Sequence, residues 1–274
     1  MMRIARRQMI SRGGLAALAV IWCAFAAPFP AAAAAVPDAR HGPLVAAASD
    51  LQFALEEVLA AFALESGVRA RVTYGSSGNL SRQIAQGAPF EIFMSADESY
   101  VESLSSRGLT QGAGDLYGIG RIVLFVPEGS PLTPDPQLAD LARRLRDGES
   151  GRIAIANPEH APYGRAAAQA LRSLGLWEAI EPRLVLGDNV AQAAQFASTG
   201  NTDGGIIAWS LALAPQMRER GRYALLPAAL HESLSQRMVL LKGASPAAGR
   251  LYAHLRSGAS RAVFERYGFV LPSE

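Results

Sequence analysis

Cysteine is almost absent from this chain. Among its 274 residues there is a single cysteine, Cys23, and it lies in an apolar stretch close to the N-terminus. Once that stretch is removed, the remaining chain has no thiol, no disulfide and no cysteine ligand for a metal ion. Thiol catalysis is therefore excluded for the mature protein.

Histidine and basic runs are scarce as well. The four histidines are scattered, and their spacing does not suggest a metal-binding cage. No basic run follows the N-terminal segment, so nucleic acid is not expected as a partner. Long-period repeats and low-complexity segments are also lacking after the alanine tract.

Residues 1–35 have the composition of an export signal. Arginines at the start precede an apolar run over residues 14–27, and alanines at 31–35 offer small residues for cleavage. Two prolines interrupt the run, which is short for a membrane span. We expect cleavage near residue 35 and a periplasmic location. The leader carries four arginines and no acidic residue, so its removal changes the formal charge from +2 to −2.

Strand patterns alternate with helix patterns along the remaining residues, about 240 in number. Buried runs such as 44–48 and 152–156 are each followed by a segment with helical periodicity. The alternation predicts an α/β class with parallel sheets. Near the end, Gln236–Leu241 looks like a strand that crosses back to the first part of the chain.

Such a return would divide the chain into two lobes joined by two crossing segments. The most strand-like run, Gly118–Pro127, is where the chain leaves the first lobe. We expect lobe I to comprise residues 42–121 and 229–274, and lobe II residues 122–228. Two crossings permit the lobes to close like a hinge around a ligand.

Serines stand where two predicted strands give way to helices. Ser49 follows the run 44–48, and Ser77 lies in Tyr-Gly-Ser-Ser-Gly before a helix. The first amides of a helix lack acceptors and carry the positive end of its dipole, so they can bind an anion. One such motif is more often an ordinary helix cap, but two copies in a βαβα order converge at the carboxyl edge of a parallel sheet.

Two acidic residues lie close to these junctions. Asp50 follows Ser49, and Asp188 precedes a predicted helix that starts at Val190. A carboxylate that faced an anion would repel it, so we expect both to point outward and to cap helix starts. Arg82 and Arg165 are near the predicted anion site, and we expect them on solvated helix faces.

Several motifs together resemble the periplasmic molybdate-binding proteins of ABC importers. They occur in the family's order over nearly the whole mature chain: Val45-Ala-Ala-Ala-Ser49, Tyr74-Gly-Ser-Ser77, Phe93-Met-Ser-Ala-Asp97, Ala156-Asn-Pro-Glu-His-Ala-Pro-Tyr-Gly164, Gly187-Asp-Asn-Val190, Gly205-Ile-Ile207 and Arg266-Tyr-Gly-Phe269. The resemblance implies a type II periplasmic binding protein fold with mixed or parallel sheets and an oxyanion held between the lobes.

The resemblance also implies which residues bind the anion. Ser49 and Ser77 would donate from lobe I through hydroxyl and main-chain groups. Tyr163 would donate its phenol from lobe II, and Val190 its backbone N–H. All four would contact oxygens of the anion and none would ligate the metal directly. Some members carry a tyrosine where this chain has Ala208, so this chain looks like the branch that uses the tyrosine at position 163.

The function implied is the capture of molybdate, and of tungstate, for delivery to a membrane permease by a monomeric protein without a cofactor. Binding of another tetrahedral oxyanion such as sulfate is the alternative. A hydrolase using Ser49 or Ser77 as nucleophile is a different class, with His160 as the only candidate base near the cleft, but no Gly-x-Ser-x-Gly motif is present. A DNA-binding regulator is disfavoured by the export signal. We therefore expect no enzyme activity.

Overall fold

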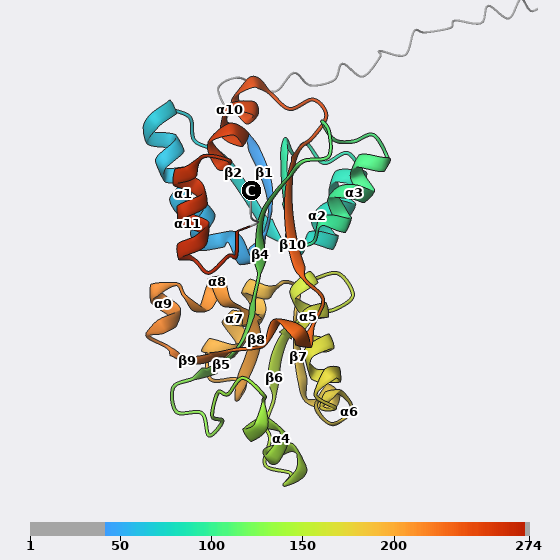
Figure 1. Cartoon of the computed structure of the whole chain (residues 1–274), viewed down its shortest axis with the longest axis vertical. Helices are drawn as coiled ribbons and strands as arrows, with labels where there is room; N and C mark the ends of the chain where they lie inside the picture. Colours follow the sequence, from blue (N-terminus) through green and yellow to red (C-terminus); the bar gives the residue numbers. More distant parts are fainter. Residues whose placement is uncertain (1–41, 272–274) are drawn as a thin grey trace, which may run out of the picture. The chain divides into compact units, whose positions relative to one another are not determined.

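The structure is a computed structural model that describes residues 42–271 of the chain. The predicted export signal and its cleavage position lie outside the described residues. Within them the chain forms two five-stranded sheets (Figure 1). Each sheet combines parallel strands with antiparallel ones, so the α/β prediction is right in class and the sheets are mixed.

The first sheet is built from both ends of the described chain, in the order β2-β1-β3-β10-β4. Its strands are β1 (Leu44–Ala48), β2 (Arg71–Gly75), β3 (Ile92–Ser95), β4 (Asp115–Gly120) and β10 (Leu234–Leu240). Strand β1 runs parallel to β2 and β3, whereas β10 pairs antiparallel with β3 and β4. The sequence prediction placed β10 two residues too late.

Helices cover both faces of this sheet because side chains alternate along β1. Val45 and Ala47 pack in one apolar cluster with α1, α10 and α11, and Ala46 packs in another with α2 and α3. Figure 1 shows α1 and α11 on one side and α2 and α3 on the other. These helices are α1 (Gln52–Ser66), α2 (Ser77–Ala85), α3 (Glu98–Ser106), α10 (Pro246–Leu255) and α11 (Gly258–Arg266).

The second sheet has the order β7-β6-β8-β5-β9 and comes from the middle of the chain. Its strands are β5 (Ile122–Pro127), β6 (Ile153–Ala156), β7 (Leu184–Gly187), β8 (Gly204–Ala208) and β9 (Gly221–Leu225). Strand β6 is parallel to β7 and β8, and β5 is antiparallel to β8 and β9. The sequence analysis did not predict β9.

The helices of the second sheet are shorter on average. They are α4 (Ala139–Arg146), α5 (Pro162–Ser173), α6 (Trp177–Ile180), α7 (Val190–Ser198), α8 (Trp209–Ala212) and α9 (Pro215–Arg218). Short 3-10 turns are η1 (Ser49–Leu51), η2 (Glu181–Arg183) and η3 (Ala228–Leu230). Helix α7 begins at Val190, as predicted. Helix α5 begins at Pro162, which places Tyr163 inside its first turn.

The chain passes between the sheets at two places that lie in contact. The predicted single strand over Gly118–Pro127 is instead two strands in different sheets, with Arg121 between them. The return passes through residues 226–233. The Arg121 guanidinium donates a hydrogen bond to the carbonyl of Leu226 at 3.1 Å, which ties the two passages together. Figure 1 shows β4 and β10 running side by side towards the second sheet.

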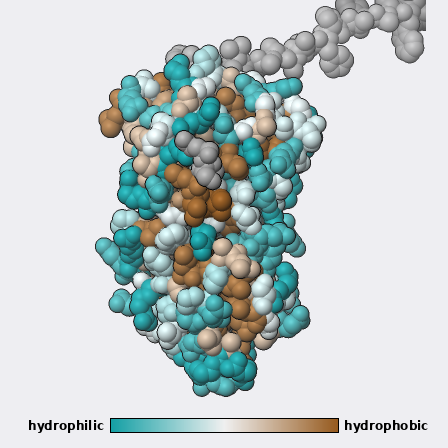
Figure 2. All heavy atoms as spheres, viewed as in Figure 1, coloured by the Kyte–Doolittle hydropathy of each residue, from teal (hydrophilic) through white to brown (hydrophobic). Residues whose placement is uncertain are grey.

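On the face of the molecule that Figure 2 shows, hydrophilic residues predominate and apolar residues gather in the middle part. The large apolar side chains exposed among residues 42–271 are Leu64, Leu116, Leu186 and Val270. In the same range, no helix combines the length and hydropathy that crossing a bilayer requires.

Candidate functional site

Ser49 lies at the carboxyl end of β1, as the strand pattern predicted. The helix does not begin at once, because a 3-10 turn over Ser49–Leu51 precedes α1. Ala48 is the residue before that turn, and no side chain caps it. The expectation that Asp50 caps a helix start is therefore wrong. The tight turn rotates Asp50 into the interior, where only 1% of it is exposed.

Ser77 is the first residue of α2, and Ser76 is its N-cap. The Ser76 hydroxyl does not bond to its own helix, as an ordinary cap would. It lies 2.9 Å from Nδ1 of His160, which belongs to the second-sheet part of the chain. The Gly78 amide also donates to the His160 carbonyl at 3.0 Å. The start of α2 thus faces the other half of the molecule.

Tyr163 and Val190 come from the second-sheet side. Pro162 opens α5, where its fixed φ suits the first helical turn, and Tyr163 follows it. Val190 is the first residue of α7, and Asn189 caps that helix by accepting from the amides of Ala191 and Gln192. The amide of Val190 belongs to the first turn, whose donors have no acceptor inside the helix.

The four predicted residues line one small cavity between the two sheets. Its volume is about 10 Å³, and its lining is Ala48, Ser49, Asp50, Gly75, Ser76, Ser77, Ala96, Ala161, Pro162, Tyr163 and Val190. We call it the inter-sheet cavity. No lysine or arginine lines it. Ala208 does not line it either, being buried in β8 opposite Ile122. A cavity of this size accommodates about one water molecule, so a larger ligand requires the two halves to separate.

The two serine hydroxyls are free to donate into this cavity. Ser77 Oγ accepts a hydrogen bond from the Ala96 amide at 2.9 Å, and Ser49 Oγ accepts from the Ala191 amide at 3.3 Å. Because the amide supplies the proton in each bond, the hydroxyl proton is left for another acceptor. The site therefore offers uncharged donors from helix starts on both sides.

Asp50 is part of the inter-sheet cavity, contrary to the expectation that it points outward. Its Oδ2 accepts from the phenol of Tyr163 at 3.0 Å and from Nε2 of Gln236 at 2.9 Å. Its Oδ1 is buried and has no hydrogen-bond partner. Burial raises the pKa of Asp50 to about 6, an effect that the bonds from Gln236 and Tyr163 only partly offset.

Gln236 and Tyr117 were missed by the sequence analysis. Gln236 is fully buried on β10, and its Nε2 also donates to the Tyr163 oxygen at 2.9 Å. Tyr117 on β4 donates to Oε1 of Gln236 at 2.7 Å, which orients the amide so that its NH₂ group faces Asp50. Burial first, and the charge of Asp50 second, raise the pKa of the Tyr163 phenol well above its ordinary value, so it stays a donor.

Further contacts join the two sides around the cavity. Arg165 on α5 is partly exposed, and beyond the solvated face expected for it, it forms an ion pair with Asp97 and donates to the Tyr100 hydroxyl. Asp188 is exposed, as expected, but Asn189 caps the helix in its place. Asp188 accepts instead from Asn79 at 3.2 Å. Arg82 donates to Asn79 on its own helix.

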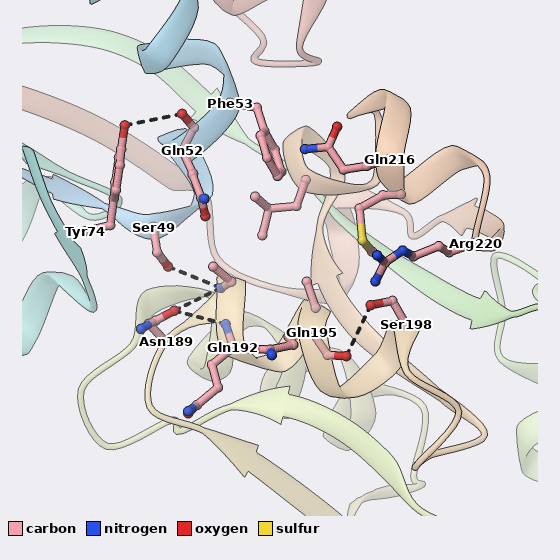
Figure 3. Close-up of a pocket in the computed structure, with 14 residues that line it drawn as sticks. Ser49, Gln52, Phe53, Tyr74, Asn189, Gln192, Gln195, Ser198, Gln216 and Arg220 are labelled. Atoms are coloured by element: carbon pink, nitrogen blue, oxygen red, sulfur yellow. Dashed lines mark hydrogen bonds between the residues drawn. The ribbon is translucent and has the colours of Figure 1, made fainter.

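A larger pocket opens beside the inter-sheet cavity, and Ser49 borders both. Its volume is about 500 Å³. Figure 3 shows amide side chains around it, with Gln52 from α1, Gln192 from α7 and Gln216 from α9. The pocket is far too large and open to enclose a small inorganic anion. It is therefore better suited to be an entry route to the inter-sheet cavity than to be the binding site.

Metal and catalytic groups are sparse in this region. Across residues 42–271, no cluster of His, Cys, Asp and Glu has the arrangement of a metal site. His160 contacts Ser76 rather than Ser49 or Ser77, the two serines considered as nucleophiles. The candidate base is thus not hydrogen-bonded to either of them.

Known proteins resemble this chain over most of its length. Residues 43–270 match the profile of a family described as bacterial extracellular solute-binding protein. The molybdate-binding protein ModA of Rhodobacter capsulatus is 34% identical to this chain, over 86% of this chain and 91% of its own length. The molybdate-binding protein ModA of Azotobacter vinelandii is 35% identical, over 83% of this chain and 89% of its own length. The solved periplasmic molybdate-binding protein of Azotobacter vinelandii superposes with a TM-score of 0.77 at 30% identity, covering 84% of this chain and all of its own. The predicted two-sheet periplasmic binding protein fold is confirmed.

Proposed function

We propose that this chain, which belongs to the family of bacterial extracellular solute-binding proteins, captures molybdate and tungstate and delivers them to an ABC importer. The observation that carries the proposal is the convergence of Ser49, Ser77, Tyr163 and Val190 on one cavity that no cationic side chain lines. Directed neutral donors at helix starts are suited to a fully ionised oxyanion. The names of the relatives supply the identity of that anion.

Selectivity against sulfate would follow from geometry. A ring of donors spaced for a large tetrahedral anion leaves a smaller one with stretched bonds and unpaired buried groups. Each such group costs roughly 1 to 3 kcal/mol. Tungstate has nearly the same size and charge as molybdate, so we expect no discrimination between the two.

Binding would proceed by closure of two lobes. We take residues 42–121 and 229–271 as lobe I and residues 122–228 as lobe II, with the passages at Arg121 and 226–233 as the hinge. Opening would admit the anion past the larger pocket. Closure would bring Ser49 and Ser77 from one side against Tyr163 and Val190 from the other. The export signal and periplasmic location predicted from residues 1–35, a monomeric state and the absence of enzyme activity belong to the same proposal.

Titration calorimetry tests this function. The mature protein is titrated with molybdate, with tungstate and with sulfate, and sulfate is then used as a competitor. We expect one molybdate per chain, equal affinity for tungstate and no displacement by sulfate. Absence of molybdate binding, or tighter binding of sulfate, would contradict the proposal. Ester hydrolysis by the wild-type protein would revive the hydrolase alternative.

Loss of the Ser49 hydroxyl should weaken molybdate binding about tenfold, since a hydrogen bond to a charged group contributes roughly 1.5 kcal/mol or more. The variant Ser49→Ala is well suited to the test because the Ala191 amide keeps Asn189 as an acceptor. Ser198→Ala is the matched control, since Ser198 lines only the larger pocket. If Ser49→Ala and Ser198→Ala lose the same affinity for molybdate in the calorimeter, Ser49 is not a donor to the anion.

Loss of Arg165 should weaken binding by up to about fivefold. The Asp97–Arg165 pair joins the two sides, and partly exposed ion pairs contribute roughly 0.2 to 1 kcal/mol. Arg165→Ala would therefore favour the open state. Arg143→Ala is the control, because Arg143 pairs with Asp140 within one lobe. An affinity of Arg165→Ala equal to that of Arg143→Ala would show that the pair does not support closure.

A further inference from the structure

Asp50 places a carboxyl group beside a site proposed for a dianion, and no cation compensates it. Across the described residues Asp50 forms no ion pair. Its carboxyl group accepts hydrogen bonds from Tyr163 on α5 and Gln236 on β10, and its backbone carbonyl accepts one from the Ser210 hydroxyl on α8. Tyr117 on β4 is the other titratable group close enough to interact with it. An ionised Asp50 and a bound dianion would repel each other across a buried space.

The cations of the surrounding elements are engaged elsewhere. Arg165 on α5 pairs with Asp97, and Arg237 on β10 pairs with Glu98. Arg121, which follows β4, donates to the Leu226 carbonyl. Helices α7 and α8, which also pack against the turn that carries Asp50, contain no charged residue, and the charged residues of α1 are all acidic. Arg172, the other arginine of α5, stacks on Trp177. A proton is therefore the remaining means of neutralising the carboxylate.

Protonation of Asp50 would change the number of protons that Asp50 and Tyr163 can donate. With Asp50 ionised, Asp50 and Tyr163 share one proton, which the phenol donates to Oδ2, while the unpartnered Oδ1 adds an acceptor beside the cavity. A site for a fully ionised oxyanion needs donors. With one more proton on the pair, one proton can close the Asp50–Tyr163 bond and the other is free to reach an oxygen of the ligand.

We propose that Asp50 binds molybdate in its protonated form, so that each anion captured takes up one proton from solution and the carboxyl group acts as a specificity-determining donor. This inference rests on the proposed function. The geometry is supported by the pKa of Asp50, which burial raises to about 6. Above that pH the protonated fraction falls tenfold per pH unit, and the affinity for molybdate falls with it.

An ionised Asp50 would favour a partly protonated oxyanion instead of a fully ionised one. An ionised Asp50 could accept the O–H of a partly protonated oxyanion such as hydrogen phosphate, which a site of donors alone rejects. Phosphate binding that strengthens with rising pH would therefore mean that Asp50 acts as an acceptor. That result would overturn the inference.

The test is calorimetric titration with molybdate between about pH 6.5 and pH 8.5, in two buffers of different ionisation enthalpy. For the wild type we expect the affinity to fall about 100-fold over this range, with uptake of close to one proton per anion. Asp50→Asn keeps the shape and neutrality of the protonated acid, so its affinity should be independent of pH and its proton uptake absent. Asp147→Asn, which removes an exposed carboxylate that pairs with Arg143 within one lobe, should behave like the wild type.

The experiment distinguishes failure of the proposed role of Asp50 from failure of the proposed function. A wild-type affinity that is constant over this range, without proton uptake, would overturn the role of Asp50 and leave the proposed function standing. The same conclusion would follow if Asp50→Asn kept the wild-type slope. If neither the wild type nor Asp50→Asn bound molybdate at any pH, the proposed function itself would fail. The wild-type proton count needs no variant, so it decides the matter even if Asp50→Asn folds poorly.

Discussion

Replacing Val190 by proline is expected to weaken molybdate binding by about 10- to 100-fold, as removal of one hydrogen bond to a charged group costs roughly 1.5 to 3 kcal/mol. Val190 is the first residue of α7, a position where proline is favoured because its missing N–H is not used by the helix. Asn189 has the extended backbone that a residue before proline adopts. The substitution should therefore keep the helix and delete the proposed donor.

The Val190 side chain is buried, so its loss needs a control of its own. Val190→Ala removes most of that packing and keeps the backbone N–H. Titration calorimetry should find a much weaker affinity for Val190→Pro than for Val190→Ala, while circular dichroism shows equal helix content. Equal affinities of the two variants would mean that the amide does not contact the anion.

Replacing Asp50 by asparagine is expected to stabilise the ligand-free protein near neutral pH by up to about 3 kcal/mol. The pKa of Asp50 is about 6 in the folded protein, against an ordinary value of 3.8, so between these values the folded protein holds a proton that the unfolded chain has lost, and above them it contains a costly buried carboxylate. The free energy of unfolding is unaffected by the burial of Asp50 below about pH 4, where the carboxyl group is protonated in both states. It falls as the pH rises towards about 6 and then changes no further on account of this group. Two pKa units correspond to about 3 kcal/mol.

Urea denaturation of wild type and Asp50→Asn at several pH values measures this difference. Other acidic groups titrate in both proteins, so the difference between the two isolates Asp50. We expect the variant's advantage to grow from about pH 4 to about pH 6 and then to level off. An advantage that is absent, or that shrinks as the pH rises, would contradict the assignment of a buried carboxyl group without a counter-ion.

The strand-to-helix junctions at Ser49 and Ser77 could be predicted from the sequence because their signals are local, whereas Val190 was indicated only by the family resemblance. Each of the two serines follows a strand pattern and precedes a helical pattern, and parallel strands end at one edge of their sheet. That reasoning places residues at an edge without saying where a neighbouring side chain points. The 3-10 turn at Ser49–Leu51, which sends Asp50 inward, has no comparable signal.

Long-range partners escaped sequence analysis for a different reason. Gln236 reaches Asp50 from 186 positions along the chain, on a strand whose pattern indicates only burial. The division of Gly118–Pro127 at Arg121 was equally hidden, because only that one residue separates β4 from β5 and no turn or loop marks the change of sheet. The lobe boundaries and the roles of the four site residues stay predictions, which the proposed binding measurements test.

The central claim is that uncharged donors of two lobes enclose the anion in the inter-sheet cavity. Anomalous scattering at the molybdenum edge from crystals grown with molybdate tests it directly. We expect one peak, with Ser49, Ser77, Tyr163 and the amide of Val190 within hydrogen-bonding reach of its oxygens. A peak among Gln192, Gln216 and Arg220 in the larger pocket, or no peak in the protein, would contradict the claim.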